Sequence, residues 1–354
     1  MKHKRLRTLK YILLGLNIVL AAVLAWIIVT QVRKSNEIKP AAQRVAADWT
    51  VLSDAVKEKT EPVINQAKET VAAAKLEAEK KQAEAEAEAG KLKKPDDADD
   101  SNAGTASSSA VGWNDAWQYA QFSAIHSGSS VLYRAPSNRK GVTVAINAGH
   151  GTSGGQSVKT QCHPDGSAKV TGGSTAAGST TAVAVSSGTT LNDGTSEAEA
   201  TLALAKVVRQ ELLAAGYDVL MIRDGSDVQL DNVARTVIAN NNADCHISLH
   251  YDSTQSDKGL FYTSVPDIGS YRSMEPVASH WQQHHALGES VLTGMRQAGV
   301  AIYGGGSMAI DLTQTSYSTI PSIDLEVGDR ASDHSSAALQ RIGKGIVAGV
   351  GNYF

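Results

Sequence analysis

The stretch that decides the fold is Val142 to Gly154, VTVAINAGHGTSG. Val142, Val144 and Ile146 are β-branched and Ala145 is small and apolar, which predicts a strand covered on both faces, as in a parallel sheet. The strand ends in a glycine-rich turn that contains His150. Functional residues of open α/β sheets lie just past the carboxyl ends of strands, so His150 is either a candidate metal ligand or an ordinary turn histidine.

The chain after this turn alternates helices and strands. An amphipathic helix is predicted over 197–215, with Ser196 as its N-cap and Gly216 as its C-cap. A strand at 217–222, a helix at 230–241 and a strand at 245–250 follow, and a further strand lies at 321–325. This order predicts an α/β fold, an open, mostly parallel twisted sheet with helices on both faces.

Four side chains meet at one edge of that predicted sheet. His150 and His250 follow the ends of strands, Glu197 begins a helix, and Glu326 follows the strand at 321–325. Two histidines and one carboxylate leave an open coordination position, which is the pattern of a catalytic zinc site. A second carboxylate that is not a ligand provides the proton transfer that zinc hydrolysis requires.

At these residues the sequence resembles a known family. The segments AINAGHG, SEAEATLALAKVVRQELLAAGYDVLMIRD, ANNNADCHISLH and PSIDLEVG occur in that order. Together they resemble the zinc-dependent N-acetylmuramoyl-L-alanine amidases of bacterial cell walls, the amidase 3 family, from Val142 to the C-terminus. The resemblance implies one zinc ion held by His150, Glu197 and His250, with Glu326 as the catalytic carboxylate. The family spacing between the ligand glutamate and the glycine that ends the helix selects Glu197 over Glu199.

The resemblance also implies the reaction, hydrolysis of the amide between N-acetylmuramic acid and L-alanine in peptidoglycan. The chain departs from the family pattern at Asn147-Ala148, at Tyr251-Asp252 and at Val327-Gly328-Asp329. These departures leave His150, Glu197, His250 and Glu326 in place and change residues that lie near them in the sequence. The alternative from another class is a catalytically silent protein that binds the wall or regulates others on the same fold.

The N-terminal part predicts a membrane anchor. Residues 1–10 are strongly basic, and residues 11–32 form an uncharged run long enough to span a bilayer as a helix. The length of this run favours an uncleaved anchor over a signal peptide. Because the basic flank precedes the run, residues 1–34 are expected to comprise a cytoplasmic tail and a single-pass anchor, with the catalytic domain outside the membrane.

Between the anchor and the main domain we expect accessory segments. Residues 35–110 predict a helical stalk and a flexible linker, and a short apolar stripe at 45–56 allows weak self-association. Residues 111–139 read as a lead-in segment that packs on the main domain through Trp113 and Trp117. The main domain spans 140–354 and contains a Gly/Ser/Thr-rich insertion at about 156–195, expected to form weak hairpins or a mobile flap.

The remaining features carry weaker expectations. The net charge of −3 gives no basic field for nucleic acid. Arg223 and Arg235 match family arginines and are interpreted as structural, with Arg235 tying a helix to the sheet. His280 and His284 are one helical turn apart and are interpreted as a solvated helix face rather than a metal site, and His126 as a surface or packing histidine. Two cysteines, Cys162 and Cys245, make no disulfide framework. Cys245 is expected in the core, and a zinc site at Cys162-His163 is not favoured because no second Cys/His pair accompanies it.

Overall fold

The computed structural model of the chain describes residues 107–354. The predicted anchor at 11–32, the stalk with its stripe at 45–56 and most of the linker therefore lie outside the described residues. Within 107–354, no helix combines the length and the apolar character needed to cross a bilayer.

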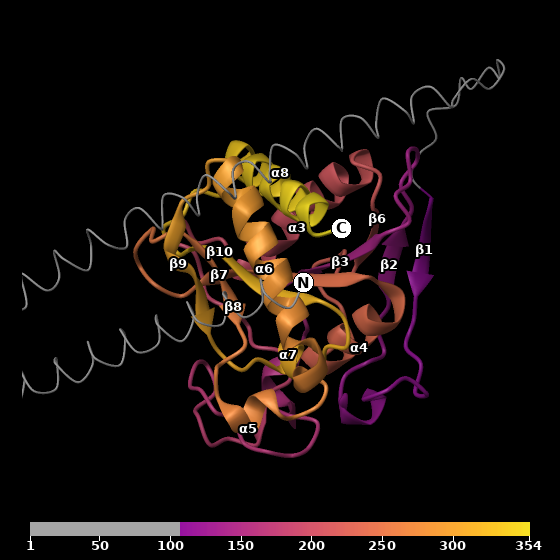
Figure 1. The fold of residues 1–354 in the computed structure, drawn as a ribbon, viewed down its shortest axis with the longest axis vertical. Helices are drawn as coiled ribbons and strands as arrows, with labels where there is room; N and C mark the ends of the chain where they lie inside the picture. Colours follow the sequence, from indigo (N-terminus) through magenta and orange to yellow (C-terminus); the bar gives the residue numbers. More distant parts are fainter. Residues whose placement is uncertain (1–106) are drawn as a thin grey trace, which may run out of the picture. The chain divides into compact units, whose positions relative to one another are not determined.

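One sheet of eight strands runs through this region, and its two edges lie at opposite sides of Figure 1. Across the sheet the order is β1 (Ser108–Val111), β2 (Ser130–Tyr133), β6 (Asp218–Met221), β3 (Thr143–Ala148), β7 (Cys245–Asp252), β10 (Ser322–Asp329), β8 (Leu260–Ser264) and β9 (Ile302–Ala309). The four central strands β6, β3, β7 and β10 are parallel to one another. The pairs β1–β2, β2–β6 and β10–β8 are antiparallel, whereas β8–β9 is parallel. The predicted parallel sheet is thus the centre of a mixed sheet.

Helices cover both faces of this sheet. On one face lie α3 (Glu197–Ala214), α6 (Val277–Gln297) and α8 (Ser336–Tyr353), and α8 packs against both α3 and α6 (Figure 1). Their apolar residues share a core with one alternate set of strand residues, Val144 and Ile146 among them. On the other face α4 (Asn232–Asn242) packs over Ala145 and Leu220. The short helices α5 (Gly269–Arg272) and α7 (Thr313–Tyr317) complete the described helices of four or more residues.

The local signals for helix α3 are confirmed. Ser196 is its N-cap, and the Ser196 hydroxyl accepts from the Glu199 backbone while the Glu199 carboxylate accepts from the Ser196 backbone. Gly216 follows the helix with φ of +90°, a conformation that favours glycine. These contacts fix the start of α3, and hence the position of Glu197.

The lead-in segment is part of the sheet rather than a covering layer. The segment supplies β2, which pairs antiparallel with both β1 and β6. Strand β1 consists mostly of the residues just before the segment. Trp113 and Trp117 pack against the core on the α4 face, as the sequence predicts. The buried Asp231 carboxylate accepts hydrogen bonds from the Ala124 and Ile125 backbone, which ties this segment to the start of α4.

Strands β7 and β10 show why one face of the sheet carries chemistry. Successive side chains of a strand point to opposite faces. In β7 the apolar set contains Ile247 and Leu249, and the alternate set is His246, Ser248 and His250. In β10 the apolar set packs into the same core, and the alternate set contains Asp324 and Glu326. The polar sets of neighbouring strands therefore lie side by side on one face.

Two boundaries differ from the sequence expectation. Strand β7 continues to Asp252 and β10 to Asp329, so His250 and Glu326 lie inside strands and not just past their ends. The parallel pairing continues to Glu326 beside His250, and Asp329 pairs with Asp252 after a register shift. This added pairing was invisible in the sequence because it depends on the neighbouring strand.

The insertion is an ordered segment with its own hairpin. Strands β4 (Lys159–Gln161) and β5 (Thr181–Val183) pair antiparallel, which confirms the hairpin expectation. The Asp311 carboxylate, fully buried between β9 and α7, accepts from the Val170 backbone and pairs with Lys169. The insertion is therefore attached at its middle as well as at its ends.

Candidate metal centre

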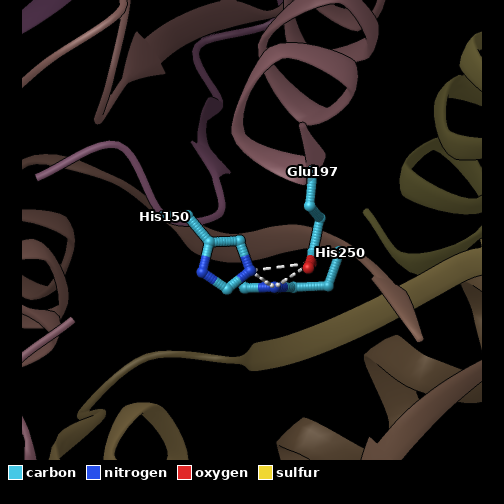
Figure 2. A group of neighbouring side chains, drawn as sticks. All are labelled: His150, Glu197 and His250. Carbon is cyan, nitrogen blue, oxygen red and sulfur yellow. Dashed lines mark hydrogen bonds and ion pairs between the residues drawn. The ribbon is translucent and has the colours of Figure 1, made fainter. Parts of the chain in front are cut away.

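Three side chains from distant parts of the chain converge on one point. His150 follows β3, Glu197 begins α3, and His250 lies near the end of β7; all three point toward one another in Figure 2. His150 Nε2 lies 2.7 Å from Glu197 Oε1, and His250 Nδ1 lies 3.0 Å from the same oxygen and 3.1 Å from His150 Nε2. Their possible ligand atoms form the one group of three or more His, Cys, Asp or Glu side chains within 107–354 that fits a metal ion.

This donor set fits zinc. Two imidazole nitrogens and one carboxylate oxygen are ligands that zinc accepts, with an open position in catalytic sites. Donors about 2.1 Å from a tetrahedral zinc ion are roughly 3.4 Å apart. The separations of 2.7 to 3.1 Å between His150, Glu197 and His250 come close to that value. A small outward movement of the three side chains would accommodate the ion.

His150 sits in a strained turn that two arginines support. Its φ is +64°, a left-handed conformation that is uncommon for residues other than glycine. Buried Arg235 donates to the carbonyl oxygens of Ala148 and His150, and buried Arg223 donates to those of Ala148 and Gly149. Burial lowers the pKa of Arg235 to about 9, so it stays charged at neutral pH. Both arginines are therefore structural, as the sequence predicts, and they hold the turn that contains His150.

Glu197 is held by backbone donors on both of its oxygens. The Thr189 backbone donates to Oε2 at 2.8 Å, and the Tyr251 backbone donates to Oε1 at 3.1 Å. Burial raises the pKa of this carboxyl, but the hydrogen bonds from His150 and His250 outweigh burial and hold it well below its ordinary value. Glu197 therefore stays an anion, which is the form that binds a metal. Glu199 is instead occupied by the helix cap with Ser196.

The two histidines present opposite ring nitrogens to the site. His150 Nδ1 lies 2.8 Å from the carbonyl oxygen of Ser186, so it can donate there and leave Nε2 free for a metal. His250 turns Nδ1 to the site, and its Nε2 faces Asp324 Oδ2 at 3.7 Å. Burial disfavours the charged His250 ring, but the carboxylates of Asp324 and Glu197 outweigh it and raise the pKa of His250 to about 10. A metal would therefore displace a proton from this site.

Glu326 lies beside His250 on the neighbouring parallel strand. The two residues are register partners on strands about 4.8 Å apart, and both line a cavity of about 670 Å³. Burial and the nearby Asp324 carboxylate raise the pKa of Glu326 well above its ordinary value, against a smaller opposing effect of His250. Its Oε2 has no hydrogen-bond partner in the described part of the chain. The cavity thus holds a half-buried carboxyl group, with one unpartnered oxygen, next to the three converging side chains.

The insertion supplies contacts that the sequence did not reveal. Ser186 and Thr189, near its end, bind His150 and Glu197, and Gly188 between them has φ of +81°. A Cβ at Gly188 would come within 2.8 Å of His150 Cδ2 and 2.9 Å of Glu197 Oε2. Residues of the insertion from Gln156 to Thr189 also line one side of the cavity. No local signal marks these residues, because the run is uniformly small and hydroxyl-rich.

The other histidines of the sequence analysis lie away from the cluster. His163 pairs with Asp311, and His126 stacks on Trp113 as a packing histidine. The interpretation of His280 and His284 as a solvated helix face is wrong for His284, which is buried and accepts a hydrogen bond from the Ser322 backbone. Cys162 and Cys245 are both free and buried, and Cys245 lies in the core as expected.

The chain matches one known family and is similar to several solved structures. The sequence model of the N-acetylmuramoyl-L-alanine amidase family matches residues 144–352. The chain is similar to the solved apo structure of the N-acetylmuramyl-L-alanine amidase Ami1 from Mycobacterium abscessus, with 20% identity and a TM-score of 0.47 over 60% of this chain and 98% of that one. It is also similar to Ami1 from Mycobacterium smegmatis, with 20% identity and a TM-score of 0.49 over 61% and 98%. For the amidase AmiC2 of Nostoc punctiforme the identity is 19% and the TM-score 0.43, over 61% and 98%. No curated protein matches the chain.

Proposed function

The chain belongs to the N-acetylmuramoyl-L-alanine amidase family, and on that premise we propose that it is a zinc-dependent hydrolase of peptidoglycan. The bond cleaved is the amide between the lactyl group of N-acetylmuramic acid and L-alanine. The observation that carries the proposal is the convergence of His150, Glu197 and His250 in one cavity with Glu326.

In this proposal each side chain has one task. His150, Glu197 and His250 hold the zinc ion, and the ion, when bound, polarises the scissile carbonyl and lowers the pKa of a water molecule toward about 7. Glu326 is the general base and then the general acid. Its carboxylate takes a proton as the water oxygen bonds to the carbonyl carbon. It returns that proton to the nitrogen as the carbon–nitrogen bond breaks, which releases a lactyl carboxylic acid group, carrying the second proton of the water, and the amine of L-alanine.

The geometry supports these roles for Glu326 and for the cavity. Glu326 is the register partner of His250, and its Oε2 is not engaged by any described side chain. A carboxyl oxygen without a partner can accept and deliver a proton without first breaking a hydrogen bond. The cavity of about 670 Å³ falls in the range of small-ligand sites and accommodates a segment of the substrate around the scissile amide.

The test is mass spectrometry of peptidoglycan incubated with the purified full-length protein. We expect stem peptides with a free N-terminal L-alanine, their loss on treatment with a zinc chelator and their return with added zinc. Glu326→Gln should bind zinc and release no peptide. Glu197→Gln should lose zinc, whereas the matched control Glu199→Gln, which changes an exposed glutamate one half-turn along α3, should keep it.

Two results would contradict the proposal. Peptide release by Glu326→Gln at the wild-type rate would remove Glu326 from its role. A wild-type protein that sediments with peptidoglycan but releases no peptide in the presence of zinc would support the alternative of a silent wall-binding protein.

We also propose that residues 11–32 anchor the enzyme in the cell membrane, with the catalytic domain on the extracytoplasmic side. This proposal rests on the uncharged run and on the basic residues before it. The full chain should stay in the membrane fraction after alkaline extraction, and a chain without residues 1–34 should not. Intact-mass measurement of the membrane protein should find residues 1–34 still attached, and a product that lacks them would show a cleaved signal.

A further inference from the structure

His250 differs from the other two candidate ligands in how its orientation is fixed. His150 is hydrogen-bonded to the Ser186 carbonyl, and Glu197 to the Thr189 backbone. The His250 ring lies against Gly149, where any Cβ would overlap the ring, so its plane is restricted on that side. Packing restricts the plane but cannot select which ring nitrogen carries the proton.

The carboxylate of Asp324 lies where it can make that selection. Its Oδ2 is 3.7 Å from His250 Nε2, the nitrogen opposite the one that faces His150 and Glu197. Its Oδ1 is buried and has no hydrogen-bond partner among residues 107–354. A carboxylate in this place attracts an Nε2–H group, and that tautomer leaves the Nδ1 lone pair free for a metal.

Strand geometry separates the task of Asp324 from that of Glu326. The two residues are two positions apart in β10 and point to the same face of the sheet. Glu326 pairs in register with His250 itself, and Asp324 pairs with Ser248, two residues before it. Asp324 is not a member of the cluster of possible ligand atoms. Both carboxylates line the cavity, and they differ in what they face: Glu326 is the register partner of His250, whereas Asp324 Oδ2 faces the Nε2 side of the His250 ring.

We propose that Asp324 is a positioning residue that holds His250 in the Nε2–H tautomer and in the orientation that binds the metal. The inference rests on the proposed zinc site and deepens it. It assigns a role to a residue that the sequence analysis did not include among the ligands or the catalytic groups. Asp324 acts through His250.

The test is the zinc affinity of the full-length protein, measured by competition with a chromophoric chelator at neutral pH. Asp324→Leu should weaken zinc binding by roughly 10- to 100-fold, the usual effect of losing the partner of a metal-bound histidine. Asp324→Asn keeps an oxygen that can accept from Nε2–H, so it should restore part of that loss. The matched control is Asp252→Asn, which removes a carboxylate that lines the same cavity but pairs with Lys258 instead of a histidine.

The outcomes separate this inference from the proposed function. If the wild type binds zinc and cleaves peptidoglycan, and Asp324→Leu binds zinc as tightly, the positioning role is refuted and the amidase assignment stands. If the wild type itself binds no zinc, the proposed function fails. Should Asp324→Leu not fold by circular dichroism, Asp324→Asn decides, and zinc affinity equal to that of Asp252→Asn refutes the inference.

Discussion

Replacement of Asp311 by alanine should loosen the middle of the insertion from the rest of the domain. This carboxylate is fully buried and joins the segment after β9 to the middle of the insertion. It pairs with Lys169 Nζ at 2.9 Å and His163 Nε2 at 3.2 Å, and it accepts from the Val170 backbone at 2.7 Å and from the Thr171 hydroxyl. No other described acidic side chain forms an ion pair with the insertion between residues 159 and 189.

The expected loss of stability follows from what alanine leaves behind. Lys169, which is only 9% exposed, would remain as a buried cation without its partner. Removing one member of a buried ion pair costs about 3–5 kcal/mol. For a domain of this size each kcal/mol lowers Tm by about 2–4 °C, so the fall in Tm should be roughly 6–20 °C.

The pH dependence of this effect has a definite sign. Burial raises the pKa of Asp311, but the hydrogen bonds from His163, Thr171 and Lys169 outweigh burial and hold it below the ordinary value of 3.8. A depressed carboxyl pKa contributes stability above the unfolded pKa, and that contribution is lost as the pH falls through the folded pKa. The difference between Asp311→Ala and wild type should therefore be constant above pH 3.8 and shrink below it.

The assays are thermal denaturation and limited proteolysis with mass spectrometry of the full chain. Asp311→Ala should melt earlier and be cut within the insertion, and its zinc affinity should fall because Ser186 and Thr189 contact His150 and Glu197. The control is Asp165→Ala, an exposed residue of the same insertion that only caps the Ser167 backbone. An Asp311→Ala protein with unchanged Tm and unchanged protease sensitivity would refute the reasoning.

Two further predictions concern a glycine beside the cluster and a buried histidine. Gly188→Ala should weaken zinc binding measured by chelator competition, because the new Cβ would press on His150 and Glu197. In addition, the backbone at this position has φ of +81°, which strains a residue other than glycine by about 1–2 kcal/mol. The open position Gly178, with φ of +86°, is the control, and equal affinities of the two alanine variants would contradict the contact argument. Burial, with the nearby charge of Arg235, lowers the pKa of His246 to about 3. As the pH falls from 6.5 toward 3, His246 therefore binds a proton in the unfolded chain but not in the folded chain. Stability should then fall by up to about 1.4 kcal/mol per pH unit for this residue. His246→Leu should show a shallower fall in urea denaturation across that range, and an identical slope would mean that His246 is not buried in its neutral form.

The sequence predicted those parts of the fold that depend on short-range pattern. Helix α3 was recognisable from its apolar stripe, from Ser196 at its start and from Gly216 after its end, since a cap acts within four residues of itself. The central strands were recognisable from their apolar runs, and their alternation with helices made parallel pairing the natural arrangement. From these elements alone, His150, Glu197 and His250 were expected at one edge of the sheet, and the structure brings them together.

The parts that the sequence did not predict depend on partners far along the chain. Strand β2 joins the sheet by pairing with β6, nearly 90 residues later, and Asp311 binds Lys169, which lies 142 residues before it. His280 and His284 are one helical turn apart whether the helix face is solvated or buried. His284 is buried because α6 packs near β10. A pattern read along the chain contains no information on such contacts.

The sequence by itself determined which residues can do the chemistry, because residue type, strand period and helix caps are local properties. The tertiary structure decided how those residues are held. Ser186 and Thr189 reach His150 and Glu197 because the end of the insertion bonds back to Gly155 and to the start of α3, and Asp324 faces His250 because β10 lies beside β7. Orientation of a side chain depends on groups that surround it in space, and these groups come from every part of the described chain.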